Sequence, residues 1–351
     1  MDHTRQEIES LARRLYGAHP ERGVTPNRSL RVHDLTRMTD GWETDVYALS
    51  VVAENPAGRQ VSDELILRVY QGQGATSKAQ REFATMAHLY EVGYPVPQVL
   101  LLEATDGLLG KPVMIMERIA GQSLGSILAC SDQATRLTLL QKFSAMLHRL
   151  HQLDWGCFPS VILPDGTQDT GEIFWDMLDH WEAQLAGVGT KGFNSTISWL
   201  RDHLSELEFG VPSPVHLDYH PHNVLVRDDG RWFVIDWTNA AISDYRLDLA
   251  WTLVLIGSYS SWEIARYLLQ AYERCADHVV DAVDDFIVAA CLRRLGTIIV
   301  SLEMGAKHLG MRQGAEVMMK DIRHIRRVYA LLQERADVSI ADVEDLLTTS
   351  T

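Results

Sequence analysis

The sequence predicts an α+β fold in which a strand-rich first part is followed by a mostly helical second part. Up to about residue 119, short apolar runs alternate with turn residues such as Asn-Pro and Asp-Gly, which is typical of antiparallel hairpins. From Gln133 onward, apolar residues recur every three or four positions, as they do in amphipathic helices. The length of 351 residues is enough for two lobes, each with its own core.

The first part is expected to begin with a helix and to continue as a sheet with one further helix. Residues 4–16 carry an apolar helical stripe. The expected strands are residues 30–40, 46–53, 64–70, 98–103 and 112–119. In the second helix, Ser77 is the expected N-cap, Gln80 completes a capping box and Gly93 ends the helix. Its expected buried stripe consists of Phe83, Met86, Ala87 and Tyr90.

The second part is expected to consist of helices around one short hairpin. A proline-containing and glycine-containing stretch, residues 155–171, reads as a loop between the first two of these helices. The last dozen residues read as a frayed acidic tail. The expected helices are residues 133–151, 172–185, 245–256, 262–275, 284–299 and 311–333.

Composition and charge limit the classes of protein to which the chain can belong. With 46% hydrophobic and 23% charged residues, it has an ordinary soluble composition. A formal net charge of -15 argues against nucleic acid as a partner. No apolar run reaches the ~18 residues of a membrane span, and the N-terminus lacks the apolar core of a signal peptide. The 4 cysteines are scattered and are expected to be free thiols, so we predict a cytoplasmic protein.

The residues that carry chemistry gather in one stretch, residues 214–237. Two short apolar runs flank the sequence Asp-Asp-Gly at residues 228–230, and an Asp-Gly turn between strand-like runs predicts a hairpin. Antiparallel pairing folds the second strand back along the first. Asn223 and Asp236 are therefore expected side by side, with Asp218 on the loop just before them.

This arrangement suits phosphoryl transfer. The Asn223 amide and the Asp236 carboxylate offer the hard oxygen donors that Mg²⁺ prefers. The Asp218 carboxylate can accept the proton of an attacking hydroxyl. The spacing His-x-Asp-x-x-x-x-Asn, followed by an apolar strand that ends in Asp, matches the catalytic loop and the metal-binding Asp of kinases.

These residues resemble those of the aminoglycoside phosphotransferase / choline kinase-like family of small-molecule kinases. His216, Asp218 and Asn223 match the loop motif of that family, and Ile235-Asp236-Trp237 matches its metal-binding strand. The sequence DYRLDLA at residues 244–250 looks like the start of the family's D-x-x-x-D-L-A helix. The resemblance extends over about residues 41–250 and is specific at the catalytic stretch.

The resemblance implies a bilobal, protein-kinase-like fold. It places a nucleotide-binding N-lobe at residues 1–117 and a C-lobe with the catalytic loop and the acceptor-binding helices at residues 118–351. It implies ATP or GTP and Mg²⁺ as cofactors, and a small-molecule hydroxyl as the acceptor of the γ-phosphate. An aminoglycoside or another antibiotic is the expected acceptor, with choline, amino alcohols and sugars as alternatives. The motifs carry no signal for ATP over GTP or for an oligomeric state.

The resemblance also assigns roles in the N-lobe. Arg68 takes the place of the cation that binds nucleotide phosphates, and Glu82 that of its helix partner. Gly41 falls where kinases place a nucleotide-covering loop, although this segment has a single glycine. Backbone groups near Glu117 and Ile119 are expected to bind adenine.

In the C-lobe, His216 and Asp248 are expected to support the catalytic loop, with Asp248 accepting hydrogen bonds from the loop backbone. A protein kinase is disfavoured because no APE-type activation segment follows Asp236. A separate helical face is a candidate acceptor site: one aromatic and three acidic residues at three- or four-residue spacing suit a cationic substrate, although a solvated face reads the same way. This face consists of Trp175, Asp176, Asp179 and Glu182.

Two alternatives come from other classes of protein. The sequence GQSLG at residues 121–125 matches the nucleophile elbow of serine hydrolases, with Ser123 as the nucleophile. Against it, the preceding strands read as hairpins rather than βαβ units, and the kinase-like family carries a similar segment at this place. The second alternative is a zinc site formed by His216, His220 and His222, which leaves Asn223 and Asp236 without a role.

Overall fold

The computed structural model describes residues 2–24, 30–38, 44–55, 57–72, 74–105, 110–163, 169–190, 192–304 and 322–349. The chain forms two compact units. The first contains the described residues up to Gly121 together with Arg227–Thr238, and the second contains the remaining described residues. The first unit thus ends its N-terminal segment at Gly121 and also includes the second strand of the hairpin.

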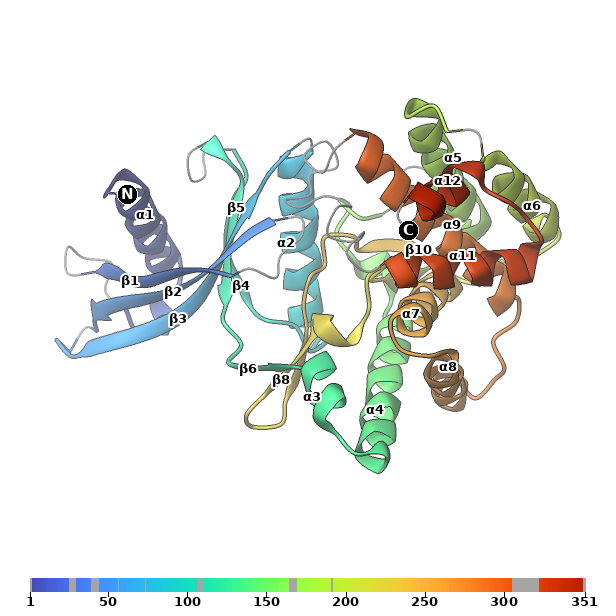
Figure 1. The fold of residues 1–351 in the computed structure, drawn as a ribbon. Helices are drawn as coiled ribbons and strands as arrows, with labels where there is room; N and C mark the ends of the chain where they lie inside the picture. The colour runs from blue at the N-terminus through green and yellow to red at the C-terminus, as the bar shows by residue number, and fades with distance from the viewer. Residues whose placement is uncertain are drawn as a thin grey trace. The chain divides into compact units, whose positions relative to one another are not determined.

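The first unit is built on a five-stranded antiparallel sheet of order β1-β2-β3-β5-β4 (Figure 1). Each strand covers a segment that was predicted as a strand, since β-branched and apolar residues alternate between turn residues. The strands are β1 (Arg31–Met38), β2 (Thr44–Glu54), β3 (Gln60–Tyr70), β4 (Val99–Glu103) and β5 (Val113–Glu117).

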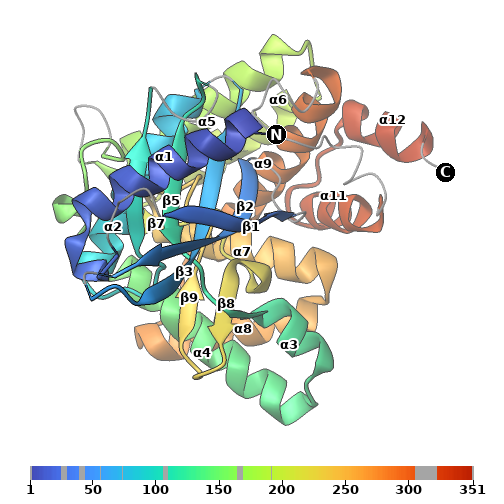
Figure 2. The same cartoon turned by 90° about the vertical axis from the view of Figure 1, so that its left-hand side faces the viewer.

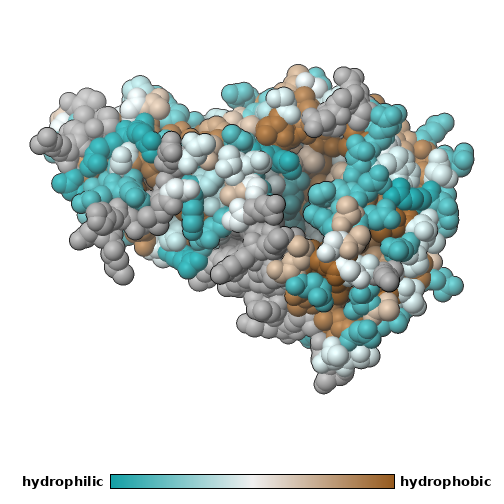
Figure 3. Space-filling model, turned by 90° about the horizontal axis from the view of Figure 1, so that it is seen from above, coloured by the Kyte–Doolittle hydropathy of each residue, from teal (hydrophilic) through white to brown (hydrophobic). Residues whose placement is uncertain are grey.

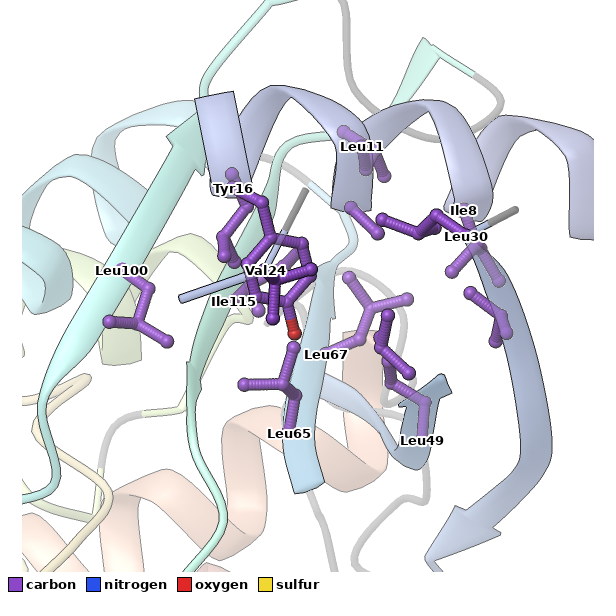
Figure 4. Packing of buried hydrophobic residues seen from close by; sticks show 14 of the residues in the cluster. Ile8, Leu11, Tyr16, Val24, Leu30, Leu49, Leu65, Leu67, Leu100 and Ile115 are labelled. Atoms are coloured by element: carbon purple, nitrogen blue, oxygen red, sulfur yellow. The ribbon is translucent and has the colours of Figure 1, made fainter. Parts of the chain in front are cut away.

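One face of this sheet is covered by α1 (Asp2–Ala18), which runs across the strands (Figure 2). The predicted helical stripe is buried there: Ile8, Leu11 and Tyr16 point toward strand residues such as Leu65 and Leu67 (Figure 4). Alternate residues of β3 therefore face the core, and Arg68 lies on the opposite side of that strand. A short 3-10 helix, η1 (Pro20–Arg22), follows α1.

The other helix of the first unit, α2 (Ala75–Glu91), corrects two predictions. Its N-cap is Gly74, with φ at 73°, and no side chain caps it, so the prediction of Ser77 as N-cap was wrong. Glycine adopts this left-handed conformation without strain, and the helix begins three residues earlier than predicted. At the other end, Gly93 adopts φ 74° and closes the helix as predicted.

The buried face of α2 is also rotated relative to the predicted stripe. Of the predicted residues only Met86 is fully buried, and Tyr90 is 47% exposed. The buried face instead includes Glu82, which is 0% exposed. An ion pair formed by Glu82 inside the unit, described below, explains why a charged residue lies on the buried side.

The second unit is mostly helical, as predicted (Figure 1). Its longer helices follow the apolar stripes read from the sequence, and α4 has the predicted bounds. The helices are α3 (Leu124–Cys130), α4 (Gln133–His151), α5 (Thr170–Gly187), α6 (Asn194–Leu204), α7 (Tyr245–Tyr259), α8 (Trp262–Ala276), α9 (Val283–Met304), α11 (Ile322–Ala336) and α12 (Ala341–Thr349). The short 3-10 helices are η3 (Trp155–Cys157) and η4 (Pro221–Asn223).

The predicted hairpin is present as β8 (Val224–Arg227) and β9 (Trp232–Val234), neighbours in a sheet of order β6-β8-β9 with β6 (Gly121–Ser123). Its turn is closed by hydrogen bonds from Gly230 N to Arg227 O (2.8 Å) and from Arg227 N to Arg231 O (2.9 Å). Gly230 has φ 81°, which explains the glycine of the Asp-Gly turn. A second small sheet pairs β7 (Ser213–Val215) with β10 (Ala241–Ser243).

The C-terminal segment corrects another prediction, because residues expected as a frayed tail form α12. Val343 and Ile340 are buried at 0% exposure, and the Tyr329 hydroxyl donates to Glu344 (2.7 Å) while accepting from Ile340 N (2.9 Å). Two buried apolar residues and these bonds hold the short helix against α11, a long-range effect that an acidic local sequence does not reveal.

Surface features agree with the composition. On the face drawn in Figure 3, hydrophobic side chains lie in separate groups among hydrophilic ones. Among the described helices, none is long and apolar enough to cross a membrane. Cys130, Cys157 and Cys275 are exposed free thiols, and Cys291 is a buried one.

Candidate active site

The predicted catalytic loop lies in the second unit, between β7 and η4, and is anchored by Asp248. The Asp248 carboxylate accepts hydrogen bonds from the backbone N–H groups of His216 and Leu217, each at 2.8 Å. These are the bonds expected of Asp248 from the sequence. Burial alone would raise the pKa of Asp248, but the hydrogen bond and charge of His151 and the contacts of His216 outweigh it and hold that pKa below 3.8.

A buried chain of hydrogen bonds continues from Asp248 into the helices. His151 on α4 lies 3.2 Å from the Asp248 carboxylate through Nε2 and 2.7 Å from the Tyr272 hydroxyl on α8 through Nδ1. Asp244 is the N-cap of α7 and accepts from Arg246 N, so the helix that carries Asp248 begins where the sequence predicted. The loop is therefore held by the helical core.

We expect Asp248→Asn to destabilise the protein, because an amide replaces one of the two oxygens that accept buried N–H groups. The free energy of unfolding should fall by about 2–3 kcal/mol in denaturant titrations near neutral pH. The pKa of Asp248 is lower in the folded protein than its ordinary value of 3.8, so its carboxylate stabilises the fold above about pH 4. This contribution is lost as the pH falls through the folded-state pKa, and the difference between variant and wild type should shrink there.

A matched control is Asp284→Asn, because Asp284 is 72% exposed in its ion pair with Arg335. It should change the free energy of unfolding by less than about 1 kcal/mol. Equal effects of the two substitutions would contradict the role given to Asp248.

The Asp218 carboxylate is held from two directions but remains 30% exposed. Trp251 Nε1 donates to its Oδ1 at 3.3 Å, and Asn223 Nδ2 donates to its Oδ2 at 3.3 Å and to its backbone oxygen at 3.0 Å. The backbone N–H of Asp218 donates to His216 Nδ1 at 3.2 Å. A partly exposed carboxylate with a fixed orientation can accept a proton from a bound hydroxyl.

In the first unit, Arg68 connects two of the other predicted site residues. Its guanidinium lies 2.9 Å from Glu82 Oε1 and 2.9 Å from Asp236 Oδ1. The Glu82 carboxylate also accepts from the Tyr70 hydroxyl (2.6 Å) and from the Trp237 backbone N–H (3.3 Å). The structure thus brings Arg68, Glu82 and Asp236 together.

Burial sets the electrostatics of this cluster. It raises the pKa of Glu82 to about 7, although Arg68 opposes the shift. Burial disfavours the charged form of Arg68, but the two neighbouring carboxylates outweigh this and raise the pKa of Arg68 above its ordinary value. Arg68 Nε has no hydrogen-bond partner among the described residues. The guanidinium is therefore a permanent positive charge beside Asp236.

Asp236 has φ 67°, a left-handed conformation that is uncommon for residues other than glycine but tolerated by aspartate. Its side chain is 35% exposed, and Thr238 Oγ1 donates to its Oδ1 at 3.3 Å. Asn223 belongs to the second unit and Asp236 to the first, and the structure describes their surroundings separately. Their meeting at one metal ion stays a prediction.

The remaining predicted nucleotide contacts lie in and after β5. Glu117 ends that strand, and its backbone N–H donates to Gln98 O at 2.9 Å. Ile119 is 8% exposed, and no hydrogen bond to its backbone is found within the described part of the chain. Adenine binding by the backbone near Glu117 and Ile119 stays a prediction. Gly41 lies outside the described residues.

The predicted acidic face on α5 is partly neutralised. Arg201 on α6 donates to Asp179 and to Glu182, each at 2.7 Å. Trp175 packs against Phe174 and Phe209, with ring centroids 5.2 Å and 5.9 Å away. Asp176 is exposed, and no ion pair of it is found among the described residues. The face offers a cationic ligand less negative charge than its sequence indicates.

Ser123 has a local structural role. Its hydroxyl caps α3 by accepting from Ser126 N at 3.2 Å, and it lies 3.3 Å from His222 Nδ1. Serine is a preferred N-cap because its oxygen satisfies a free N–H of the first helical turn. The GQSLG sequence thus forms a short strand and the start of a helix that follows an antiparallel sheet, and not the elbow of an α/β-hydrolase.

We expect Ser123→Ala to retain turnover, because Ser123 caps α3 and is not expected to act as a nucleophile. The loss of the cap should lower the free energy of unfolding by about 1 kcal/mol. A fluorophosphonate probe should leave the wild-type protein unlabelled, as seen by mass spectrometry. Stoichiometric labelling of Ser123 would contradict this assignment.

The zinc alternative has no support in the described residues, where no group of three His, Cys, Asp or Glu side chains is placed to hold a metal ion. Of the three loop histidines, His216 accepts from Asp218 N, His222 contacts Ser123, and His220 Nε2 lies 3.7 Å from Asp218 Oδ2. They support the loop instead of converging on one point.

Sequence reasoning missed several residues that contact the site. Most of them lie on elements far from the motifs in the sequence; Tyr70, two residues after Arg68, and Trp251, directly after the DYRLDLA sequence, lay near a recognised signal. The missed residues are Tyr70, His151, Trp251, Tyr272 and Arg293.

Comparisons with known proteins agree with this picture. A model of the phosphotransferase enzyme family matches residues 34–282. A protein from Ralstonia eutropha JMP134 assigned to the aminoglycoside phosphotransferases has 17% identity and a TM-score of 0.65, covering 92% of this chain and 98% of that one. A mutant of aminoglycoside phosphotransferase APH(4)-Ia, in ternary complex with ADP and hygromycin B, has 18% identity and a TM-score of 0.52, covering 86% and 94%.

A third similar structure is ethanolamine kinase from Plasmodium vivax, with 10% identity and a TM-score of 0.59, covering 98% of this chain and 90% of that one. Identities this low establish a shared fold and leave the acceptor open. The similar structures confirm the predicted α+β fold, with an antiparallel sheet in the N-terminal region and helices in the C-terminal region.

The fold and the site define a kinase-like phosphotransferase. Because the family model spans well over half of the chain, the protein belongs to the phosphotransferase enzyme family. It is a small-molecule kinase, as the sequence predicted, and the serine hydrolase alternative is not supported.

Proposed function

We propose that the protein transfers the γ-phosphate of ATP, or of GTP, to a hydroxyl of a small molecule, with Asp218 as the general base. The observation that carries the proposal is the Asp218 carboxylate itself. It is partly exposed, both of its oxygens accept N–H donors, and it lies on a loop pinned by buried Asp248. This combination fixes a proton acceptor where a ligand can reach it.

The residues present fit a magnesium ion. The Asn223 amide nitrogen is committed to Asp218, so its oxygen remains as the donor for a ligand, and Asp236 supplies a carboxylate. Two hard oxygen donors from the protein suit Mg²⁺, which keeps waters and substrate phosphates as its other ligands. When bound, Mg²⁺ would neutralise charge on the phosphates during transfer. We propose that Asn223 and Asp236 hold it.

The nucleotide would be held mainly by the first unit. Arg68 is a permanent cation that can neutralise phosphate oxygens, and Glu82 holds its guanidinium in place. The backbone near Glu117, at the end of β5, and near Ile119 would bind adenine. We propose these contacts as the nucleotide site.

The chemical step follows from these positions. The acceptor oxygen attacks the γ-phosphorus and forms a P–O bond, and its proton passes to Asp218. The bond between the γ-phosphorus and the bridging oxygen breaks, and the nucleoside diphosphate leaves with that electron pair. The products are a phosphate monoester, the diphosphate and one proton, which Asp218 returns to solvent.

Two classes of acceptor deserve equal testing, since the similar structures include a complex with hygromycin B and an ethanolamine kinase. We propose a small, hydroxyl-bearing and often cationic acceptor of one of these classes. The ion pairs of Arg201 with Asp179 and Glu182 neutralise part of the acidic face that was expected to suit a cationic acceptor. An amino alcohol, which carries a single positive charge, is therefore as good a candidate acceptor as an aminoglycoside.

The test is an acceptor screen with enzymatic detection of the nucleoside diphosphate. Kanamycin, hygromycin B, choline, ethanolamine and a hexose would each be supplied with ATP or GTP and with Mg²⁺ or EDTA. We expect diphosphate release to depend on Mg²⁺ and to rise well above the acceptor-free rate with one class of acceptor. A protein that neither binds nor turns over either nucleotide would contradict the proposal.

A further inference from the structure

Leu217, the residue before Asp218, has an unusual backbone conformation. Its φ is 56°, in the left-handed region, and its side chain is buried at 4% exposure. For a residue other than glycine this conformation is strained and persists only where surrounding contacts enforce it. Neighbouring groups must therefore hold Leu217 in this conformation, directly before the proposed base.

Two side chains hold Leu217 from opposite sides. Asp248 Oδ1 accepts from its backbone N–H at 2.8 Å, and Arg293 Nη1 on α9 donates to its backbone oxygen at 2.8 Å. The next N–H along the chain, that of Asp218, donates to His216 Nδ1. The peptide group between Leu217 and Asp218 is thus fixed at both its oxygen and its nitrogen, which sets the direction in which the Asp218 side chain leaves the backbone.

Arg293 also lies against Trp251. Its guanidinium carbon is 4.0 Å from the centroid of the Trp251 ring, a close cation–π contact. Trp251 lies on α7, is 5% exposed, and donates through Nε1 to Asp218 Oδ1 at 3.3 Å. One guanidinium therefore touches both the peptide that carries Asp218 and the indole that contacts its carboxylate.

We propose that Arg293 and Trp251 act together as positioning residues for Asp218. Arg293 holds the strained peptide of Leu217 and orients the Trp251 ring, and Trp251 in turn fixes one oxygen of the carboxylate. Asn223 holds the other oxygen, so the rotation of the carboxylate is set from both sides. The proposal rests on the proposed role of Asp218 as the base.

The chemistry of the pair explains why these residue types are present. A planar guanidinium can donate to a carbonyl at its edge while its face lies on an indole, whereas the point charge of a lysine cannot do both. Phenylalanine in place of Trp251 would keep a ring for the guanidinium but would lose the N–H. Trp251→Phe therefore removes the N–H donated to Asp218, whereas Arg293→Lys removes the combination of the carbonyl bond with the ring contact.

The activity test compares Trp251→Phe with Trp262→Phe. Trp262 is a matched control, because its ring makes the same kind of contact with a guanidinium outside the site, 5.6 Å from the guanidinium carbon of Arg335. We expect Trp251→Phe to lower kcat about tenfold, the factor that one hydrogen bond is worth. The Kd of the nucleotide should be unchanged, and Trp262→Phe should keep wild-type turnover. With no acceptor identified, the readout is the slow hydrolysis of MgATP, in which water is the nucleophile.

A spectroscopic test does not depend on turnover. The protein has 9 tryptophans, and ¹⁵N-labelled indole N–H resonances can be assigned to Trp251 and Trp262 by the two phenylalanine variants. We expect the Trp251 resonance to move in Asp218→Asn and in Arg293→Lys, while the Trp262 resonance stays in place.

The outcomes separate the inference from the proposed function. A Trp251 resonance that is unmoved in Asp218→Asn, or a kcat of Trp251→Phe within twofold of the Trp262→Phe control, would overturn the positioning role. Absence of any nucleotide turnover by the wild type would instead contradict the proposed function, and the resonances would still decide whether Trp251 and Arg293 orient Asp218. A merely structural role would lower stability and nucleotide binding together, which denaturant titration and the nucleotide Kd would show.

Discussion

Asp218→Asn is expected to lower kcat by about 10²–10⁴-fold, the usual contribution of a positioned general base. The substitution keeps the shape of the side chain and removes the charge that accepts the proton. It also places an NH₂ group against either the Trp251 or the Asn223 donor, both of which now face a carboxylate oxygen. Because a loose transition state needs little help from a base, the loss can fall at the low end of that range.

Nucleotide affinity should barely change in Asp218→Asn, because the phosphates are assigned to Arg68 and the metal ion. The Kd of the nucleotide would be measured by calorimetry beside the kcat. A suitable control is Asp228→Asn in the exposed turn of the hairpin, which should behave as wild type. If Asp218→Asn abolished nucleotide binding and spared kcat, Asp218 would be a metal ligand or a structural brace.

The second large effect is expected at Asp236. Asp236→Asn removes the negative charge proposed to hold Mg²⁺, while asparagine tolerates the left-handed backbone and can still accept from Arg68. Turnover in Mg²⁺ should fall at least about 10³-fold, since a catalytic metal contributes several kcal/mol to the transition state. Asn223→Ala is expected to act in the same direction.

Both Asp236→Asn and Asn223→Ala should leave the protein folded. Asp236 is 35% exposed, and Asn223, at the end of η4, is a buried polar residue and not part of the apolar core, so neither substitution opens a cavity in that core. Thermal unfolding near that of the wild type, together with lost turnover, is the expected pattern. Turnover within tenfold of the wild type at saturating Mg²⁺ would refute the metal assignment, and an unfolded Asp236→Asn would point to a structural ion pair with Arg68.

Features with a local physical cause were predictable from the sequence. The Asp-Gly turn gave the hairpin because Gly230 adopts φ 81°, and the apolar stripe after the Asp132 cap gave α4 with its observed bounds. The catalytic loop was recognisable because Asp218 and Asn223 are five residues apart and hydrogen-bond to each other. In each case a few neighbouring residues determine the outcome.

Features that depend on distant partners were missed. The start of α2 is set by Gly74 and not by a Ser77 cap. Its buried face includes Glu82 because Glu82 forms an ion pair with Arg68 on β3. The acidic face of α5 could not be judged without Arg201 on α6. Arg293, on a helix 75 residues after Asp218, has no local sign of its contact with the catalytic loop.

The transfer of the phosphoryl group from nucleotide to acceptor can be followed directly. ATP labelled with ¹⁸O in the γ-phosphate would be incubated with Mg²⁺ and the acceptor panel, using the wild type, Asp218→Asn and Asp236→Asn, and the products would be weighed by mass spectrometry. We expect the wild type to move the labelled phosphoryl group onto a hydroxyl of one acceptor far faster than either variant does, and only when Mg²⁺ is present. Labelled phosphate esters formed equally well by both variants, or an acceptor cleaved without gaining label, would contradict it.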